Sequence, residues 1–578
     1  MVMARHKKLL WLPLAMVLIV PNASGMILLA HRTSGSTRQL SNYMEEIQNA
    51  IVLTRQSEKN PLRAFEALDK WGMILSNPKA LPNKVVGLCY SLEAYCLVRV
   101  GRDQEAIRAY RDCLASLSSS SSSSGVLLEP STVEECKMGI AFALQRLMRY
   151  EEANQQFLCC NNNERAIIGA ATCCLRLGDA GAAMEALRRS SSTKPPSNEI
   201  RDMGKTLEFL SGPPETKTTM VLKDCTGSTP LYRWIRAVAN RASSERQSRP
   251  PESTFDFLQL AAVNQSPFDD PELVVLDDKL RLHTLLTIGN VSCWPRGFIL
   301  PQQLPEFQAV KDTGKGWILK SRAGYGSNGN QLVLGEKGVD AVQLDDDDDD
   351  AMMGRESLLC QRLVHPSLLI QGRKFSLRVY VYYFLRNAGA GSSSLFLSKK
   401  GLVKLASMPF REGSRDERMF MTNSGREESM LQHDFDFLKK ELEAGGGSYP
   451  EFWSLLRQSI GQIMNQYDQH VSSTPPALRQ QLAKLGLPKI LGFDFMVSPD
   501  LKPVLLEVNR FPGLEPRCEA DAAVKQTVVR EAWICAATRL RMDIETIGIL
   551  NDDDTTMSMS SLNSFEQIHF SVKDTTCT

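Results

Sequence analysis

Two carboxylates and an amide lie close together near the C-terminal end of the sequence, in a segment that is otherwise mostly apolar. Asp494, Glu507 and Asn509 belong to residues 491–513, LGFDFMVSPDLKPVLLEVNRFPG. An unpaired buried charge is costly, so carboxylates in an apolar segment need a partner. Three oxygen-bearing side chains can converge on a hard cation such as Mg²⁺, which proteins usually bind together with substrate phosphates. The alternative is that Asp494 and Glu507 pair with nearby Lys or Arg side chains.

The elements that position these groups are predicted to be two short strands. Residues 491–497 and 501–508 form apolar runs that a Pro-Asp turn joins, and this pattern favours a β-hairpin. A second strand carries the complementary charges, because Lys374, Ser376 and Arg378 alternate with apolar residues and therefore share one face. Two cations on one face call for an anion, either the carboxylates of the hairpin or a phosphate.

A glycine-rich turn lies between two further strand-like segments. Residues 316–320 and 331–334 are apolar, and residues 321–330 between them include Gly326 and Gly329. A strand, a glycine-rich turn and a second strand can form a flap whose backbone N–H groups cover phosphates. A plain glycine-rich hairpin is the alternative.

The N-terminal half has a different pattern, since residues 40–212 are predicted to be helical. Three short connectors at 100–103, 148–150 and 177–179 are alike, and each is followed by a small residue and then a larger apolar one. The pattern indicates degenerate tetratricopeptide-like repeats, with an irregular helical bundle as the alternative. Stacked helical pairs commonly offer a concave surface for peptide partners. The small and large residues are Ala106 with Tyr110, Ala153 with Phe157 and Ala183 with Leu187.

The remaining segments differ in composition. The predicted order is a signal peptide or signal anchor at 1–25, the helical repeats at 40–212, a linker at 213–254, a mixed α/β domain at 255–546 and a disordered, acidic, Ser/Thr-rich tail at 547–578. The first segment is charged, then apolar, then small, which is the order of a secretory signal. It predicts entry into the secretory pathway or anchoring to a membrane.

The composition of the whole chain excludes some classes of partner and site. The 578 residues carry a formal net charge of +1, which gives no signal for nucleic acid, and we expect no nucleic-acid partner. None of the 14 cysteines has the spacing of a zinc site, so we interpret them mainly as buried free thiols.

Five segments in one order resemble the tubulin–tyrosine ligase-like family of the ATP-grasp superfamily. They are PRGFILP at 295–301, WILK at 317–320 with the glycine-rich turn, CQRLVHPSLLIQGRKFSLRVYV at 360–381, MFMTN at 419–423 and the hairpin at 491–513. The resemblance implies an α/β ATP-grasp domain, which in this chain follows the predicted helical repeat region.

The resemblance also implies roles for individual residues. By position, Lys320, Gly326 and Gly329 correspond to ATP phosphate contacts, Gln361 to the adenine hinge, and Lys374 and Ser376 to further nucleotide contacts. Thr422 and Asn423 correspond to residues near the ribose or the amino-acid substrate, and Asp494, Glu507 and Asn509 to Mg²⁺ ligands. Arg378 and Lys404 correspond to catalytic residues that hold the acidic substrate or the transferred phosphoryl group. Lys279 is a weak candidate for the family's early ATP-binding lysine.

Two positions depart from the family's pattern. The family usually has Asp at the position of Ser376 and Arg at that of Lys404. Ser keeps a hydrogen bond but loses a charge, and Lys keeps the charge but loses the bidentate fork of Arg.

The activity that the resemblance implies is an ATP-dependent ligase that joins a carboxylate to an amine through an acylphosphate. Its cofactors are ATP and Mg²⁺, and its substrates are an amino acid such as glutamate, glycine or tyrosine and a protein acceptor such as tubulin. Such an acceptor implies the cytoplasm or cytoskeleton, in contrast to the N-terminal signal. The alternatives are a nucleotide-binding pseudoenzyme and a repeat scaffold that recruits protein partners.

Overall fold

The computed structural model of the chain describes residues 37–57, 62–78, 81, 83–118, 130–160, 163–189, 197–211, 231, 234, 235, 238, 257–310, 316–322, 330–333, 357–385, 394–414, 416–420, 422, 432–471, 477–516, 519–540 and 565–568. The chain divides into two compact units, residues 2–200 and 201–578, and each is described by itself. The predicted signal at 1–25 lies outside the described residues. Within the ranges given above, we find no helix with the length and apolar character needed to span a membrane.

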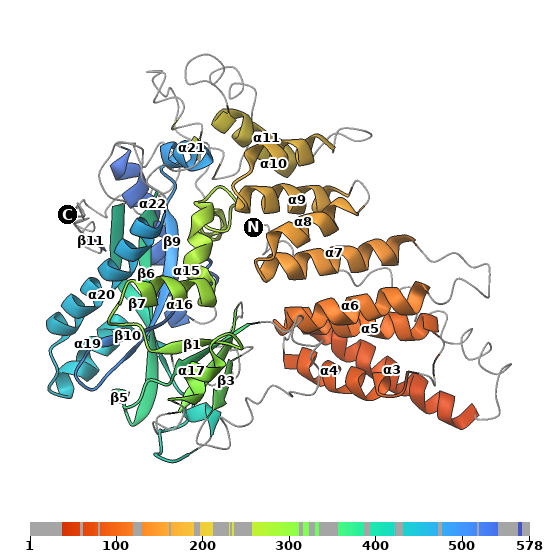
Figure 1. The fold of residues 1–578 in the computed structure, drawn as a ribbon, viewed down its shortest axis with the longest axis horizontal. Helices are drawn as coiled ribbons and strands as arrows, with labels where there is room; N and C mark the ends of the chain where they lie inside the picture. Colours follow the sequence, from red (N-terminus) through yellow and green to blue (C-terminus); the bar gives the residue numbers. More distant parts are fainter. Residues whose placement is uncertain are drawn as a thin grey trace. The chain divides into compact units, whose positions relative to one another are not determined.

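The first unit is built from helices that each pack against the next one along the chain (Figure 1). In addition, α5 contacts α7, and α7 contacts α9, as the first helices of stacked pairs do. The prediction of a helical N-terminal region is therefore confirmed. The helices are α3 (Thr37–Gln56), α4 (Leu62–Leu75), α5 (Asn83–Arg99), α6 (Asp103–Ser118), α7 (Pro130–Arg146), α8 (Tyr150–Leu158), α9 (Glu164–Arg176) and α10 (Ala180–Arg188), with α11 (Asn198–Ser211) crossing the boundary between the units.

The three similar connectors of the sequence form the same turn. Each places one residue in the left-handed region, at φ 79° for Gly101, 58° for Met148 and 82° for Gly178. The next amide donates back to a carbonyl five residues earlier, for example from Arg102 to Leu97 at 2.8 Å. This is a Schellman-type ending, which stops the first helix of each pair and redirects the chain.

Small residues let successive pairs approach each other. The Tyr110 ring of α6 packs on Gly139 of α7, where an added Cβ would lie 2.5 Å from the ring. Phe157 of α8 packs on Gly169 of α9 with the same 2.5 Å spacing. Because two different pairs use the same arrangement, the packing repeats along the unit as the sequence predicts.

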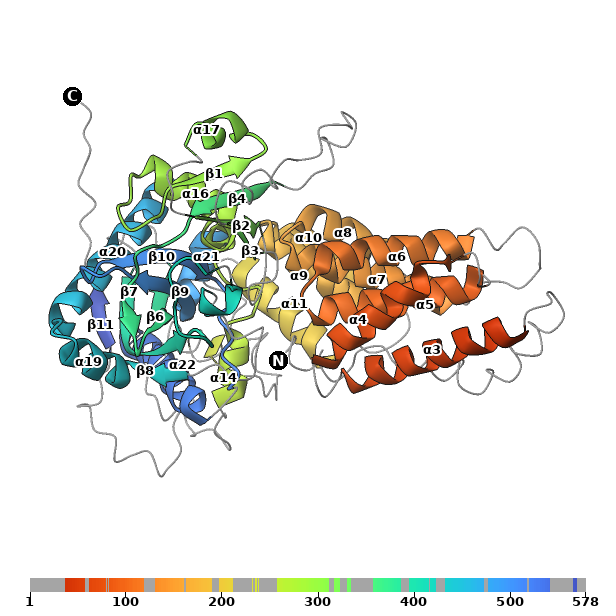
Figure 2. The same cartoon turned by 90° about the horizontal axis from the view of Figure 1, so that it is seen from below.

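The second unit contains a four-stranded antiparallel sheet in the order β1-β4-β2-β3. Its strands are β1 (Gly297–Leu300), β4 (Leu358–Arg362), β2 (Trp317–Ser321) and β3 (Asn330–Val333). Phe298, Phe307 and Trp317 form its aromatic core together with α17 (Leu304–Gln308). Figure 2 shows these strands as a layer separate from the larger sheet of the same unit.

The larger sheet has seven strands in the order β10-β9-β6-β7-β11, with β5 on β6 and β8 on β7. The strands are β5 (Leu369–Ile370), β6 (Arg373–Phe384), β7 (Ser394–Leu405), β8 (Gln432–Asp434), β9 (Lys489–Val497), β10 (Pro503–Asn509) and β11 (Phe565–Ile568). The helices of this unit are α14 (Phe257–Val263), α15 (Val274–Asp277), α16 (Lys279–Ile288), α19 (Phe435–Ala444), α20 (Tyr449–His470), α21 (Ala477–Leu485) and α22 (Glu519–Arg539), with short 3-10 turns at Pro271–Leu273 and Glu417–Met419.

Helices cover the two faces of this sheet unequally. One face of β6, with Leu377 and Val379, packs into the core that includes α16, α19 and α20 (Figure 1). On the opposite face Tyr380 and Tyr382 pack against α22. Lys374, Ser376 and Arg378 precede these tyrosines on that face, as the period-two prediction requires. The mixed α/β prediction for this half of the chain is confirmed.

The predicted linker at 213–254 is wrong for its central part. Trp234 and Ile235 are buried, and the Trp234 indole N–H donates to the Leu485 carbonyl at 2.7 Å. The Trp234 ring also meets Trp533 of α22 edge-on, with centroids 5.1 Å apart. The polar and proline-rich residues on either side masked this apolar anchor in the sequence.

The predicted disordered tail at 547–578 is wrong for four residues. Phe565–Ile568 form β11, which pairs antiparallel with β7 from Ser398 to Leu395. A strand of only four residues within a Ser/Thr-rich segment is too short to produce a recognisable alternating pattern.

Replacing Trp234 with Ala should lower the free energy of unfolding by about 3–5 kcal/mol, because a large buried side chain leaves a cavity and an unpaired Leu485 carbonyl. Urea denaturation of the full chain measures this. Leu258→Ala is the matched control, since Leu258 is 47% exposed and its loss should change the value by less than about 0.5 kcal/mol. Equal effects of the two substitutions would contradict the anchoring role of Trp234.

Candidate functional site

The hairpin of β9 and β10 brings the two carboxylates together as the sequence predicts. Asp494 and Glu507 are direct cross-strand partners, and Asn509 lies opposite Gly492. The register shifts between Leu505 and Glu507, which leaves Leu506 as an extra residue in β10. Such a bulge re-aims the side chains that follow it and frees a backbone group from the ladder.

Arg378 and Asp494 form a bidentate ion pair across β6 and β9. Arg378 Nε donates to Asp494 Oδ1 at 2.5 Å, and Arg378 Nη2 donates to Asp494 Oδ2 at 2.7 Å. The two residues lie directly opposite each other on β6 and β9. Burial opposes the ionisation of Asp494, but the charges of Arg378 and Lys404 outweigh it and lower the pKa of Asp494 to about 2. The alternative reading of the sequence, a buried ion pair, is therefore part of the observed arrangement.

Glu507 has a different cation beside it. Lys279, the first residue of α16, places its Nζ 3.6 Å from Glu507 Oε2, and both side chains are largely buried. Asp278 caps the helix by accepting the Leu280 and Arg281 amides, and this fixes the start of α16 at the site. The weak sequence candidate Lys279 thus lies in the same cluster as the hairpin carboxylates.

Asn509 connects the two carboxylates. Its Nδ2 lies 3.4 Å from both Asp494 Oδ2 and Glu507 Oε1. Rotating the amide by half a turn would present its oxygen at the same place, so three oxygen ligands can meet there. Hard oxygen donors of this kind suit Mg²⁺, which keeps several waters and substrate oxygens in its coordination shell. These three residues therefore fit a magnesium ion.

No group of three or more His, Cys, Asp or Glu residues within the described ranges could hold a metal by itself. A cation at the hairpin consequently depends on the Asn509 amide and on substrate oxygens in addition to the two carboxylates. This partial protein shell is what the binding of Mg²⁺ through one or two carboxylates plus phosphates requires.

Lys320 reaches the same place from β2 of the smaller sheet. Its Nζ donates to Gln361 Oε1 at 2.7 Å and to the Leu506 carbonyl at 3.0 Å, the group that the bulge frees. Burial lowers the pKa of Lys320 to about 8, although the nearby charge of Glu507 raises it. Both hydrogen-bond acceptors are neutral, so an incoming phosphate offers this lysine a better charge partner.

Gln361 is almost fully buried, and its side chain orients Lys320. Its amide nitrogen also contacts the Pro295 carbonyl at 3.5 Å. The sequence assigned Gln361 to the adenine hinge, and that role stays a prediction. The observed contacts add a structural role in positioning Lys320.

Lys374 on β6 is held between two aromatic rings. Its Nζ lies 4.8 Å from the ring centroids of both Phe410 and Phe420 and donates to the Val364 carbonyl at 3.3 Å. Burial lowers the pKa of Lys374 to about 8. Phe410 and Phe420 give no signal in the sequence, because nothing in their spacing relates them to a lysine far away along the chain.

Ser376 and Lys404, the two residues that depart from the family's pattern, lie opposite each other on neighbouring strands. Ser376 of β6 and Lys404 of β7 are cross-strand partners, and the Thr422 hydroxyl donates to Ser376 Oγ at 2.7 Å. The structure thus places Ser376, Lys404 and Thr422 together, with the Lys404 charge acting on Asp494. Gly326, Gly329 and Asn423 lie outside the described residues.

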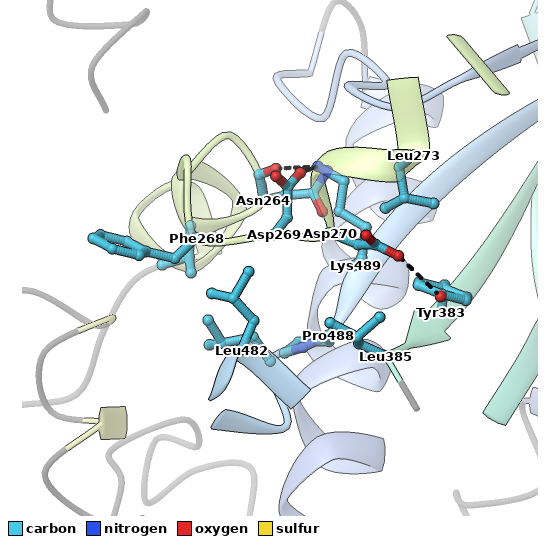
Figure 3. Close-up of a pocket in the computed structure, with 12 residues that line it drawn as sticks. Asn264, Phe268, Asp269, Asp270, Leu273, Tyr383, Leu385, Leu482, Pro488 and Lys489 are labelled. Atoms are coloured by element: carbon cyan, nitrogen blue, oxygen red, sulfur yellow. Dashed lines mark hydrogen bonds and ion pairs between the residues drawn. The ribbon is translucent and has the colours of Figure 1, made fainter. Parts of the chain in front are cut away.

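The pocket drawn in Figure 3 contains none of the predicted site residues. Asp269 and Asp270 line it. Asp270 accepts hydrogen bonds from Nε and Nη2 of Arg479, each at 2.7 Å, and from the Tyr383 hydroxyl at 3.3 Å. Lys489, at the start of β9, pairs with Asp269 at 2.8 Å.

The same aspartates hold the end of the second hairpin strand. Arg510, which directly follows Asn509, is fully buried and donates to Asp269 Oδ1 at 2.7 Å and to the Asp270 carbonyl at 2.9 Å. Every acidic group of this cluster has a basic partner, so we interpret it as a structural anchor that fixes both ends of the hairpin.

Two antiparallel sheets with flanking helices, two lysines from different sheets and an acidic hairpin define an ATP-grasp-like α/β domain. Residues 276–540 match the sequence model of the tubulin-tyrosine ligase family, and this part of the chain is a domain of that family. The match is wider than the span of 295–512 over which the motifs were recognised in the sequence.

Several characterised proteins are similar to this region. The tubulin monoglutamylase TTLL4 of Mus musculus is 25% identical over 258 residues, which are 42% of this chain and 20% of that protein. The tubulin polyglutamylase TTLL11 of Homo sapiens is 27% identical over 269 residues, 42% of this chain and 36% of that protein. The chain therefore covers only a fifth to about a third of the length of these relatives.

Replacing Asp494 with Asn should lower the free energy of unfolding by about 3–5 kcal/mol, because it leaves the buried Arg378 guanidinium without its counter-charge. Urea denaturation measures the loss. Asp500→Asn, in the exposed turn of the same hairpin, is the control and should change stability little.

A double substitution tests the cause of this loss. Arg378→Met with Asp494→Leu removes both charges and should restore most of the stability, because apolar residues replace the buried pair. If the double variant is less stable than Asp494→Asn alone, an uncompensated charge is not the reason for the loss.

Proposed function

We propose that this chain is an ATP-dependent ligase that joins the amino group of an amino acid to a carboxylate of a protein or peptide acceptor. The observation that supports it best is the convergence of Lys320, Arg378, Asp494, Glu507 and Asn509 from two sheets on one place. The family match and the tubulin glutamylases among the similar proteins support glutamate as the amino acid and tubulin-like tails as the acceptor.

In the proposed reaction an acceptor carboxylate oxygen bonds to the γ-phosphorus of ATP as the bond to ADP breaks. The amino nitrogen then bonds to the acyl carbon, phosphate leaves, and the amine loses a proton. Such chemistry needs positioned groups and neutralised charge more than a protein nucleophile. Mg²⁺, held by Asp494, Glu507 and Asn509, would supply charge neutralisation at the phosphates when it is bound.

The chain's own cations have separate roles in this proposal. Lys320 and Lys374 bind the nucleotide phosphates, for which their burial and neutral acceptors prepare them. Arg378 orients Asp494 through Nε and Nη2, and its Nη1 can donate to the acidic substrate or the transferred phosphoryl group. Lys404 holds the carboxylate of a substrate on the β7 side of the site.

A nucleotide-binding pseudoenzyme is the second candidate, and the pairing of Ser376 with Lys404 favours it. Ser376, where the family usually has Asp, lacks the negative charge. Lys404, where the family usually has Arg, lacks the bidentate guanidinium, and the two residues lie opposite each other. Nucleotide binding in this case persists through Lys320 and the hairpin, and the helical unit recruits protein partners.

ATP turnover separates the two candidates. The full chain with Mg-ATP, free glutamate and an acidic peptide should release ADP and add glutamate to the peptide, measured by coupled ADP assay and mass spectrometry. Glu507→Gln should reduce the rate by at least about 100-fold, because the metal site loses a charge. Glu443→Gln, on the exposed surface of α19, is the control and should keep the rate.

A thermal shift with Mg-ATP completes this test. Stabilisation of the wild-type chain by nucleotide without any ADP release would favour the pseudoenzyme. No stabilisation and no release would contradict both candidates, and unchanged turnover in Glu507→Gln would refute the metal assignment.

We further propose that the helical unit binds a peptide of the acceptor or of a partner protein.

We also propose that residues 1–25 direct the chain to a membrane or into the secretory pathway. A fluorescent fusion of the full chain should associate with membranes, whereas Leu14→Arg with Val17→Arg should leave it diffuse, since charges disrupt the apolar run. Thr33→Arg, outside this run, is the control. The same distribution for all three proteins would contradict the targeting proposal.

A further inference from the structure

The short strand β11 fills one half of the free edge of β7. Phe565, Glu566, Gln567 and Ile568 pair antiparallel with Ser398 to Leu395, while β8 covers β7 from Leu402 to Lys404. An exposed sheet edge presents unpaired N–H and C=O groups that can pair with another extended segment. The four residues of β11 therefore pair with a part of the β7 edge whose backbone groups can bind an extended strand.

The apolar side chains of β11 have defined partners. The Phe565 ring meets Phe396 edge-on with centroids 5.7 Å apart, and it meets Tyr382 at 6.3 Å. Ile568 is 5% exposed and belongs to the main core, where its Cγ2 would lie 3.5 Å from a Cβ placed on Gly461 of α20. Two apolar positions at opposite ends of the strand thus fit two separate parts of the surface.

The acidic residue between them is recognised by α20. Glu566 accepts a hydrogen bond from the Trp453 indole N–H at 3.0 Å and forms an ion pair with Arg457. Partial burial opposes its charge, but Trp453, Arg457 and Lys399 together lower the pKa of Glu566. Charge-assisted hydrogen bonds of this kind select for an acidic side chain.

We propose that the Leu395–Ser398 edge of β7, with Trp453 and Arg457 of α20, is a peptide-binding site for an extended segment of the order aromatic, acidic, polar, aliphatic. In this structure Phe565–Ile568 fill the site from within the chain. Main-chain pairing supplies affinity in this mode of recognition, and alternate side chains supply specificity. The site lies outside the proposed ATP cluster, and the inference does not depend on ligase activity.

The sequence before β11 is consistent with a strand that can exchange with a second peptide. Residues 551–564 read NDDDTTMSMSSLNS and join a four-residue strand to the rest of the chain. Holding so short a strand far along the chain from α22 has an entropic cost, so a peptide of the same order from another protein can compete for the edge.

Amide hydrogen exchange in the full chain tests the recognition of Glu566. Glu566→Lys and Arg457→Glu should each raise the exchange rate of the β11 amides by about tenfold, and the double variant should restore protection by reversing the pair. Lys440→Glu, an exposed position on α19, is the control and should leave the exchange unchanged. Protection that is unaffected by either single variant would overturn the proposal.

Peptide binding tests the site itself. In a full-length variant with Phe565→Ser and Glu566→Lys, a fluorescein-labelled peptide of residues 560–572 should bind saturably in an anisotropy titration. The wild-type chain should bind it at least about tenfold more weakly, because its own strand competes. A peptide carrying Lys in place of the glutamate should not bind.

Two results would overturn the peptide-binding site. One is no binding to the double variant, provided that its helical and sheet content match the wild type by circular dichroism. The other is equal binding of both peptides, which indicates unspecific apolar association. If the double variant does not fold, the charge-reversal exchange experiment decides by itself.

Discussion

The bidentate ion pair between Arg378 and Asp494 fixes how the central strands of the large sheet align, and the other site residues take their positions from that alignment. With Arg378 opposite Asp494 on β9, Glu507 lies beside the same point on β10. A slip of one residue would turn every polar side chain of β6 into the apolar core. The pair therefore specifies register, a role in which buried ionic groups are retained even when they add little stability.

The cluster around this pair contains more basic side chains than acidic ones. Burial lowers the pKa of both Lys320 and Lys374 to about 8, because the charged form of each lysine loses its hydration in the protein interior. A polyanion such as a nucleotide triphosphate would relieve this cost. The burial of Lys320 and Lys374 therefore favours an anionic ligand beside them, and three further basic side chains lie in the same cluster: Lys279, Arg378 and Lys404.

Local sequence patterns predicted most of this site, whereas long-range contacts were not accessible to them. The alternation at Lys374 and Arg378 is a period-two signal, and the hairpin around Asp494 was predicted from two apolar runs with a turn between them. The structure confirms the strands that both patterns predicted. In contrast, Phe410 and Phe420 reach Lys374 through loops that have no period. Trp234, which is buried, and Phe565, which is partly buried, lie in polar stretches of sequence, and a single apolar anchor produces no pattern there.

The buried position of Trp234 fixes a point of the chain between α11 and α14. α11 ends at Ser211 and α14 begins at Phe257, and between them the Trp234 indole N–H donates to the Leu485 carbonyl. A fixed point divides a long connection into two shorter ones, and each shorter connection loses less entropy when its ends are held. Trp234 ties this part of the sequence to Leu485 and Trp533, so a substitution at Leu485 would also act on a position 251 residues earlier in the chain.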